Sequence, residues 1–301
     1  MKDMLLIVNP NAGRNGYRDS LSDVLYTIHK CDYQTTVAFT NGHGDPTRIA
    51  AEQGGRYDRV VCMGGDGTLS ETVSGLMRLP PEQRPELAYI PMGTSNDSAT
   101  TLGLSRDPAM AAYTAACGRP IPIDIGRFNE GRYFTYVAAF GAFTEVSYET
   151  PQDQKNTLGW LAYAFDAMSR LPNLTHRWCK IEYDGGEIEG DFIFCAVTNA
   201  RRFAGFIRLD DSAGVSLSDG LFEVILIRTP ETILQVGPIV SDILANNFTS
   251  DYAMLLHSKR VRFTFEEPVK WTMDGEDGGK QENVICENMP HAVSMIVNED
   301  I

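Results

Sequence analysis

The alternation of short apolar runs with helical patterns across residues 1–126 is the feature that most limits how this chain can fold. The predicted strands are Met4–Val8, Gln34–Thr40, Arg59–Met63, Leu87–Pro91 and Ile121–Ile125. Between them, apolar residues recur at helical spacing, as at Leu69, Val73 and Leu76. Strands that alternate with helices form βαβ units, so this half is predicted to be an α/β domain built on a parallel sheet.

The apolar spacing changes to a period of two in residues 127–301. Alternation such as Val261, Phe263 and Phe265 predicts strands with one buried face, and Asp184-Gly185-Gly186 predicts a hairpin. This half is therefore predicted to be an antiparallel β-sandwich with one helical insert at Asn156–Leu171. The expected domains are residues 1–126 and 127–301, the last residues packing back on the first domain. A site is expected in the cleft between them.

Composition narrows the classes of partner. The net charge is −14, which argues against nucleic acid because its binding needs a basic face. No apolar stretch is long enough to span a bilayer, and Asn9-Pro10 breaks the N-terminal apolar run too early for a secretory signal. The six cysteines form no CxxC pair, so neither a zinc site nor a disulfide framework is expected. A cytoplasmic location follows as the expectation.

Glycine-rich turns follow several of the predicted strands. They lie at residues 9–13, 41–44, 64–68 and 92–97. In a parallel sheet such turns share one edge, and the helices behind them direct unpaired N–H groups toward it. The turns match neither GxxxxGK[ST] nor GxGxxG, so the phosphate-binding lysine of a Walker motif is missing. An anion site of another kind is predicted, and its positive charge must come from elsewhere. The candidates are Arg14, Arg18, Lys155, Arg201 and Arg202.

Asp66 stands inside one of these turns, GGDGT at residues 64–68. A carboxylate beside phosphate is repulsive unless a cation lies between them, so Asp66 suggests Mg²⁺, which prefers carboxylate and phosphate oxygens. The alternative is structural: Asp66 could cap the helix that continues at Leu69. Both interpretations stay open at this point.

Six motifs occur in a fixed order along the chain: NPNAG (9–13), GGDGTLSE (64–71), PMGTSND (91–97), TNARRFAGF (198–206), SDGLFEV (218–224) and MDGE (273–276). With them the sequence resembles the diacylglycerol kinase catalytic-domain family, specifically the soluble bacterial lipid kinases. GGDGT alone is shared with NAD kinases and sphingosine kinases, whereas the ordered set is specific. The resemblance covers nearly the whole chain.

The resemblance implies a two-domain enzyme that transfers the γ-phosphoryl group of ATP to the hydroxyl of diacylglycerol or a related lipid alcohol, with Mg²⁺. It implies nucleotide binding at Asn9, Asn11, Gly13, Thr40, Gly64, Gly65, Asp66, Gly67, Thr68, Glu71, Gly93, Thr94, Asn96 and Asp97. A structural Mg²⁺ is implied at Asp219, with oxygens near Ser216 and Leu221. The general base is implied at Asp274, Glu276 or both.

The sequence departs from the family at several positions. Ser70 replaces a usual asparagine, and Ser98-Ala99-Thr100 replaces the usual Phe-Ala-Arg. Ala204-Gly205-Phe206 and Asp211-Ser212-Ala213 also differ, near the expected acceptor site, so they put the acceptor's identity in doubt.

Two other functions stay open. One is an NAD kinase-like enzyme, although the serine-threonine-alanine-tyrosine motif of that family is absent. The other is a catalytically silent nucleotide- or lipid-binding regulator.

A lipid acceptor implies transient contact with a membrane surface. Trp160 and Tyr163 of the predicted insert suit such an interface. The sequence leaves open whether the chain forms a homodimer.

Overall fold

The computed structural model describes residues 2–13, 17–94, 96–141, 177–200, 202–203, 207–209, 215–245 and 247–298. The predicted insert at 156–171 lies outside these ranges. The N-terminal half holds four strands that pair in parallel in the order β2-β1-β3-β4. They are β1 (Lys2–Val8), β2 (Tyr33–Phe39), β3 (Arg59–Gly64) and β4 (Glu86–Pro91).

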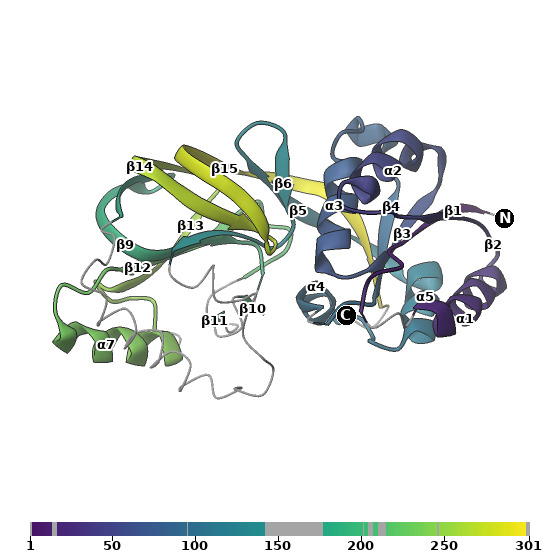
Figure 1. Cartoon of the computed structure of the whole chain (residues 1–301), viewed down its shortest axis with the longest axis horizontal. Coiled ribbons are helices and arrows are strands. Elements are labelled where there is room, and N and C mark those ends of the chain that lie inside the picture. The colour runs from purple at the N-terminus through teal and green to yellow at the C-terminus, as the bar shows by residue number, and fades with distance from the viewer. Residues whose placement is uncertain are drawn as a thin grey trace.

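Helices cover both faces of these four strands because their apolar side chains alternate between the faces (Figure 1). On β1, Met4 and Leu6 pack with α1 (Tyr17–Lys30) and α5 (Pro108–Cys117). Leu5 and Ile7 pack on the other face with α2 (Asp45–Gln53) and α3 (Asp66–Leu76). Short helical segments complete this half: η1 (Gly54–Arg56), η2 (Pro81–Gln83) and α4 (Asp97–Thr101).

The C-terminal half is antiparallel, with the strand order β13-β12-β9-β7-β14-β15. The predicted hairpin at Asp184-Gly185-Gly186 is confirmed, since it joins β8 and β9. One face carries an aromatic core around Trp271, whose ring centroid lies 5.0–5.3 Å from those of Phe140, Phe263 and Phe128. The other face packs against α7 (Ile233–Leu244). The remaining bounds are β7 (Val137–Gly141), β8 (Trp178–Tyr183), β9 (Gly186–Thr198), β10 (Arg202–Phe203), β11 (Ile207–Arg208), β12 (Phe222–Arg228), β13 (Ala253–Ser258) and β14 (Arg260–Met273).

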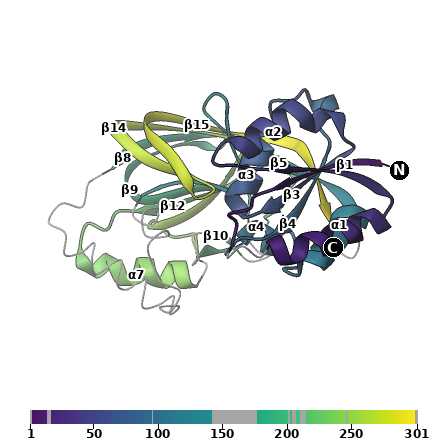
Figure 2. The same ribbon diagram turned by 45° about the vertical axis from the view of Figure 1, so that its right-hand side comes forward.

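Two strands run through both halves and join them, as two views show (Figures 1 and 2). They are β5 (Arg119–Phe128), which also pairs with β6 (Arg132–Phe134), and the long β15 (Glu276–Val297). β15 pairs with β14 near its start and with β5 further on, and Met295 reaches β4 in parallel. The expectation that residues 121–125 belong to a parallel sheet is therefore wrong: this segment pairs antiparallel, because β15 returns along it. The expected boundary at 126 falls within β5.

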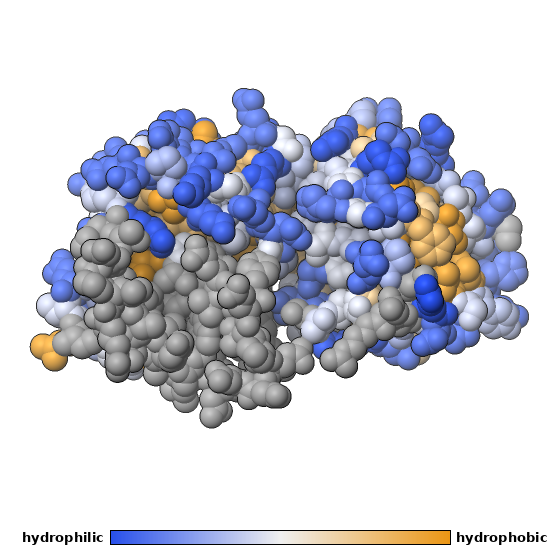
Figure 3. All heavy atoms as spheres, in the orientation of Figure 1, coloured by the Kyte–Doolittle hydropathy of each residue, from blue (hydrophilic) through white to orange (hydrophobic). Residues whose placement is uncertain are grey.

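The described surface is mostly hydrophilic in this orientation, in keeping with the net charge of −14 (Figure 3). None of the described helices has both the length and the apolar composition needed to cross a membrane.

Glu223 is an exception within the C-terminal core. It lies on β12 with no exposed surface, and neither carboxyl oxygen has a hydrogen-bond partner among the described atoms. His257 on the neighbouring β13 has its Nε2 4.0 Å from Oε1 of Glu223. Burial raises the pKa of Glu223 to about 8, and the charge of Asp219 adds to the rise. The fold therefore favours the protonated, neutral acid.

This burial predicts how stability depends on pH. Because the folded-state pKa of Glu223 is raised, its stabilising effect is full below the unfolded pKa and is lost as pH rises toward 8. The loss reaches about 1.4 kcal/mol per pH unit at most. Glu223→Gln should lack this loss. Its free energy of unfolding, measured in urea and compared with that of the wild type at each pH, should therefore become relatively larger as pH rises from 5 to 8. Glu266→Gln, an exposed position on β14, is the control. Parallel pH profiles for E223Q and the wild type would contradict the account.

Candidate active site

The first turn, NPNAG, contacts two others. The side-chain amide of Asn9 donates to Oγ1 of Thr68 over 2.9 Å, and its Oδ1 accepts the N–H of Asn11. Gly13 has φ +61°, and a Cβ there would lie 2.5 Å from the carbonyl oxygen of Met92. Glycine is thus required both by the backbone conformation and by the close approach. These contacts place the ends of β1, β3 and β4 together, as predicted from the glycine-rich turns in the sequence.

The GGDGT turn and the PMGTSND turn touch through their backbones. A Cβ on Gly93 would lie 2.8 Å from Cα of Gly65, so a side chain at this contact would have to displace the main chain. Asn96 holds the second turn: its Oδ1 accepts the N–H of Gly93 over 2.9 Å, and its Nδ2 donates to the carbonyl of Gly93 over 2.8 Å. Gly64 ends β3 with its carbonyl bonded to the N–H of Met92, and Thr94 is exposed beside the contact.

Asp66 caps a helix, although not the one that it begins. Its Oδ2 accepts the N–H of Asp97 over 3.1 Å, and its Oδ1 accepts the N–H of Ser98 over 3.0 Å. Those are the first amides of α4. The cap residue of α3 is Gly65, which has no side-chain cap hydrogen bond, so the alternative that Asp66 caps its own helix near Leu69 is not supported. Asp66 therefore fixes the PMGTSND turn and α4 against α3.

Glu71 lies one helical turn after Gly67 and holds the turn at 41–44. Its Oε2 accepts the N–H of Gly44 over 2.9 Å, and its Oε1 lies 2.5 Å from Nδ1 of His43. Burial and the charge of Glu276 raise the pKa of Glu71. The Gly44 amide and His43 lower it, but the net shift is upward. Thr40, at the end of β2, is buried and its N–H donates to Val8.

Asp274 and Glu276, from the other half, have different surroundings. Asp274 is 3% exposed, has φ +47°, and binds the backbone that enters β7. Its Oδ2 accepts the N–H and hydroxyl of Thr135, and its Oδ1 accepts the N–H groups of Tyr136 and Val137, all within 2.6–3.0 Å. Burial raises the pKa of Asp274, and these donors oppose the rise. Both carboxyl oxygens of Asp274 therefore already accept hydrogen bonds from the segment Thr135–Val137.

Glu276 begins β15 and reaches the other half of the molecule. A Cβ on Gly67 would lie 3.1 Å from Oε1 of Glu276, so this carboxylate sits against the first turn of α3. Its charge also raises the pKa of Glu71 on the same helix. The MDGE and GGDGT motifs, some two hundred residues apart in the chain, therefore meet at the junction of the halves.

The loop at 216–221 is held by Asp124, a residue that the sequence reasoning missed. Asp124 is fully buried on β5: its Oδ2 accepts the N–H of Gly220 over 2.6 Å, and its Oδ1 accepts the N–H of His291 over 2.8 Å. The signal was an aspartate inside the apolar run IPIDI. Within the loop, Oδ1 of Asp219 accepts the N–H of Leu221, and Oγ of Ser216 accepts the N–H of Ser218.

Some predicted residues cannot be placed in this site. No three histidine, cysteine, aspartate or glutamate side chains gather as a metal cluster within the described part of the chain. Of the proposed cations, Arg18 lies on α1, and the side chain of Arg202 on β10 is not described. The ranges outside the description include Arg14, Lys155, Arg201, Ala204–Phe206 and Asp211–Ala213.

Both halves of the chain resemble known proteins. Residues 3–128 match the diacylglycerol kinase catalytic domain, and residues 138–297 match the YegS C-terminal NAD kinase beta sandwich-like domain. The chain is 34% identical over 281 residues to a Bacillus subtilis protein named diacylglycerol kinase, covering 93% of this chain and 91% of that one. A Staphylococcus aureus protein of the same name is also 34% identical, over 280 residues covering 91% and 86% of the two chains.

The fold agrees as well. A crystal structure from Bacillus anthracis, described as that of a candidate diacylglycerol kinase, superposes with a TM-score of 0.80 at 27% identity, covering 100% of this chain and 96% of that one. The two-part architecture is therefore confirmed, and with identity of this extent along nearly its whole length the chain belongs to the diacylglycerol kinase family.

Proposed function

We propose that this protein is an ATP-dependent kinase that phosphorylates the hydroxyl of diacylglycerol or a related lipid alcohol. One observation carries the proposal beyond family membership: Glu276 of the C-terminal half lies against the first turn of α3, where the glycine turns converge. Phosphoryl transfer needs a phosphate site and a proton acceptor side by side. The junction of the halves supplies both.

The nucleotide would bind over the turns that end β1, β3 and β4. Helix N-termini with close glycine backbones suit phosphate, and α3 begins there with Asp66-Gly67-Thr68. The departure at Ser98-Ala99-Thr100 leaves this framework intact, because Asp66 binds the backbone N–H of Ser98 and not its side chain. Nucleotide affinity should therefore survive these changes.

The two carboxylates of MDGE are assigned different roles. Glu276 is the base: it takes the proton as the acceptor oxygen bonds to the γ-phosphorus, and the bond to ADP breaks. Asp274 is a positioning residue, because its oxygens already accept four hydrogen bonds from Thr135–Val137. It fixes the turn that precedes Glu276.

Mg²⁺ has two proposed places. The first is on the nucleotide, where a cation would offset phosphate charge next to Asp66. The second is the loop at 216–221. There the oxygen chemistry fits a hard cation, since Oδ1 of Asp219 accepts the N–H of Leu221 while Oδ2 accepts no hydrogen bond from described residues. A cation held by Asp219, with oxygens near Ser216 and Leu221, would order this loop.

A lipid acceptor has to be taken from a bilayer, so we propose that the enzyme works in transient contact with a membrane surface from the cytoplasm. Test the function with γ-labelled ATP, Mg²⁺ and a panel of diacylglycerol, monoacylglycerol, phosphatidylglycerol, sphingosine, undecaprenol and NAD. Labelled lipid phosphate is expected. Labelled NADP would identify an NAD kinase-like enzyme, and no labelled product would favour a silent regulator.

Glu276→Gln should lower kcat by about 10²–10⁴-fold, the usual contribution of a general base. The free energy of unfolding should change little, because the side chain of Glu276 makes no buried hydrogen bond in the described structure. ATP binding should be retained or slightly tightened, because the substitution removes a negative charge beside Gly67. Steady-state kinetics and equilibrium ATP titration measure the two effects separately. Full activity of E276Q would remove Glu276 from the mechanism.

Asp274→Asn should act through structure. An amide would place a donor against the N–H of Thr135, so we expect a loss of about 1–3 kcal/mol in the free energy of unfolding. The matched control is E276Q, which should unfold like the wild type. Urea denaturation that leaves D274N at wild-type stability would contradict the assigned role.

A further inference from the structure

Two carboxylates come together near the first turns of α3: Glu71, which belongs to this helix, and Glu276, which comes from the other half of the molecule. Gly67 and Glu71 are four residues apart on this helix, so they share a face. Glu276 lies against Gly67, and its charge raises the pKa of Glu71. A nucleotide triphosphate placed at the N-terminus of α3 would therefore meet two negative charges in addition to its own.

His43 offers charge that can offset one of them. Its Nδ1 lies 2.5 Å from Oε1 of Glu71, and the neighbouring Gly44 donates its N–H to the other oxygen. The side chain of Glu71 is 15% exposed, whereas that of His43 is 79% exposed. The histidine thus lies on the solvent side of a half-buried carboxylate.

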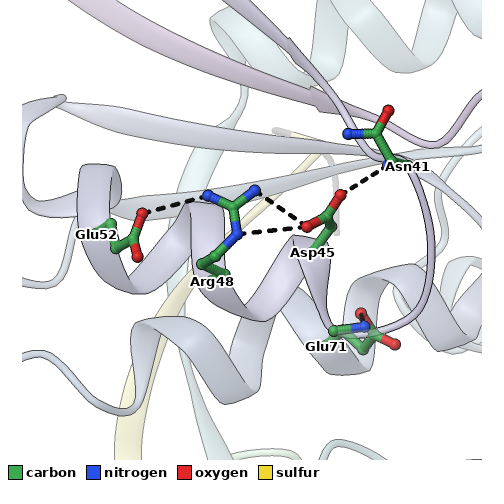
Figure 4. Close-up of polar contacts among 6 residues, drawn as sticks. Asn41, Asp45, Arg48, Glu52 and Glu71 are labelled. Carbon is green, nitrogen blue, oxygen red and sulfur yellow. Dashed lines mark hydrogen bonds and ion pairs between the residues drawn. The ribbon is translucent and has the colours of Figure 1, made fainter.

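The nearby arginine is committed elsewhere. Arg48 on α2 lies 3.0 Å from Asp45 and 3.3 Å from Glu52, and Asp45 in turn accepts the N–H of Asn41. Figure 4 shows Arg48 between these two carboxylates, with Glu71 on the adjacent helix. Among the described residues, His43 is therefore the basic side chain that pairs with Glu71.

We propose that His43 is a charge-balancing positioning residue for the nucleotide site. In its protonated form it neutralises Glu71, holds the turn at 41–44 against α3 and lowers the repulsion that the triphosphate meets. The proposal rests on the proposed function, which places the triphosphate at the N-terminus of α3. It adds a residue that the six motifs do not contain.

The groups around Glu71 fix the sign of the expected effect. Glu71 is approached by His43 from the turn and by Glu276 from β15, while Asp66 lies on its own helix. Since the other groups named here are acidic, removal of the basic partner should lower the affinity for MgATP.

The test compares the full-length wild type with His43→Asn and His43→Lys at pH 6.5, using γ-labelled ATP and diacylglycerol in mixed micelles. H43N should raise KM for ATP about 2- to 5-fold with kcat nearly unchanged, the size expected for an exposed ion pair. H43K should keep a KM close to that of the wild type. His29→Asn, an exposed histidine at the end of α1, should behave as wild type.

An unchanged KM in H43N, a KM of H43K as high as that of H43N, or a loss confined to kcat would each overturn the proposal. Titration of the protein with ATP alone, without lipid, separates this outcome from failure of the proposed function. Suppose that the wild type phosphorylates no lipid, but that the wild type and H43K bind ATP more tightly than H43N. The kinase assignment then fails and the role of His43 stands. If lipid is phosphorylated and the order is absent, only His43 is excluded.

Discussion

The antiparallel pairing of β5 with β15 is the constraint on which the rest of the structure depends. These strands pass from the sandwich into the sheet of the N-terminal half, so the halves share one hydrogen-bonded framework. Glu276 stands at the start of β15, and its position against Gly67 follows from that framework. A site assembled across two halves is usually exposed to domain motion. Here the backbone ladder limits that freedom where the carboxylate meets α3.

Three buried or half-buried carboxylates hold loops against this framework by the same kind of hydrogen bond. Asp66, Asp124 and Asp274 each accept backbone N–H groups from a segment distant in sequence. Hydrogen bonds to an ionised group are stronger than neutral ones, and losing one inside a protein is costly. The acids in the motifs are thus mainly organisers of loops. Glu276 and Glu71 are the ones that face the junction of the halves.

Local sequence patterns predicted these strands and turns, but they did not predict which distant segments pair with one another. Runs of apolar residues located β1, β3 and β4, and turn residues located the hairpin after β8, because both signals depend on neighbouring residues. Residues 121–125 were also recognised as a strand, but their antiparallel direction is set by β15, about 170 residues later. The bonding of Asp66 and the pairing of His43 with Glu71 likewise depend on tertiary proximity. A histidine in a glycine turn carries no local signal of a partner on another helix.

The central claim is that nucleotide and base meet at the junction of the halves. A crystal structure with Mg²⁺ and a non-hydrolysable ATP analogue tests it most directly. The account predicts the triphosphate at the N-terminus of α3, over the turns that end β1, β3 and β4, with its γ-phosphate on the side facing Glu276. A nucleotide bound elsewhere, or one whose γ-phosphate points away from Glu276, would contradict it.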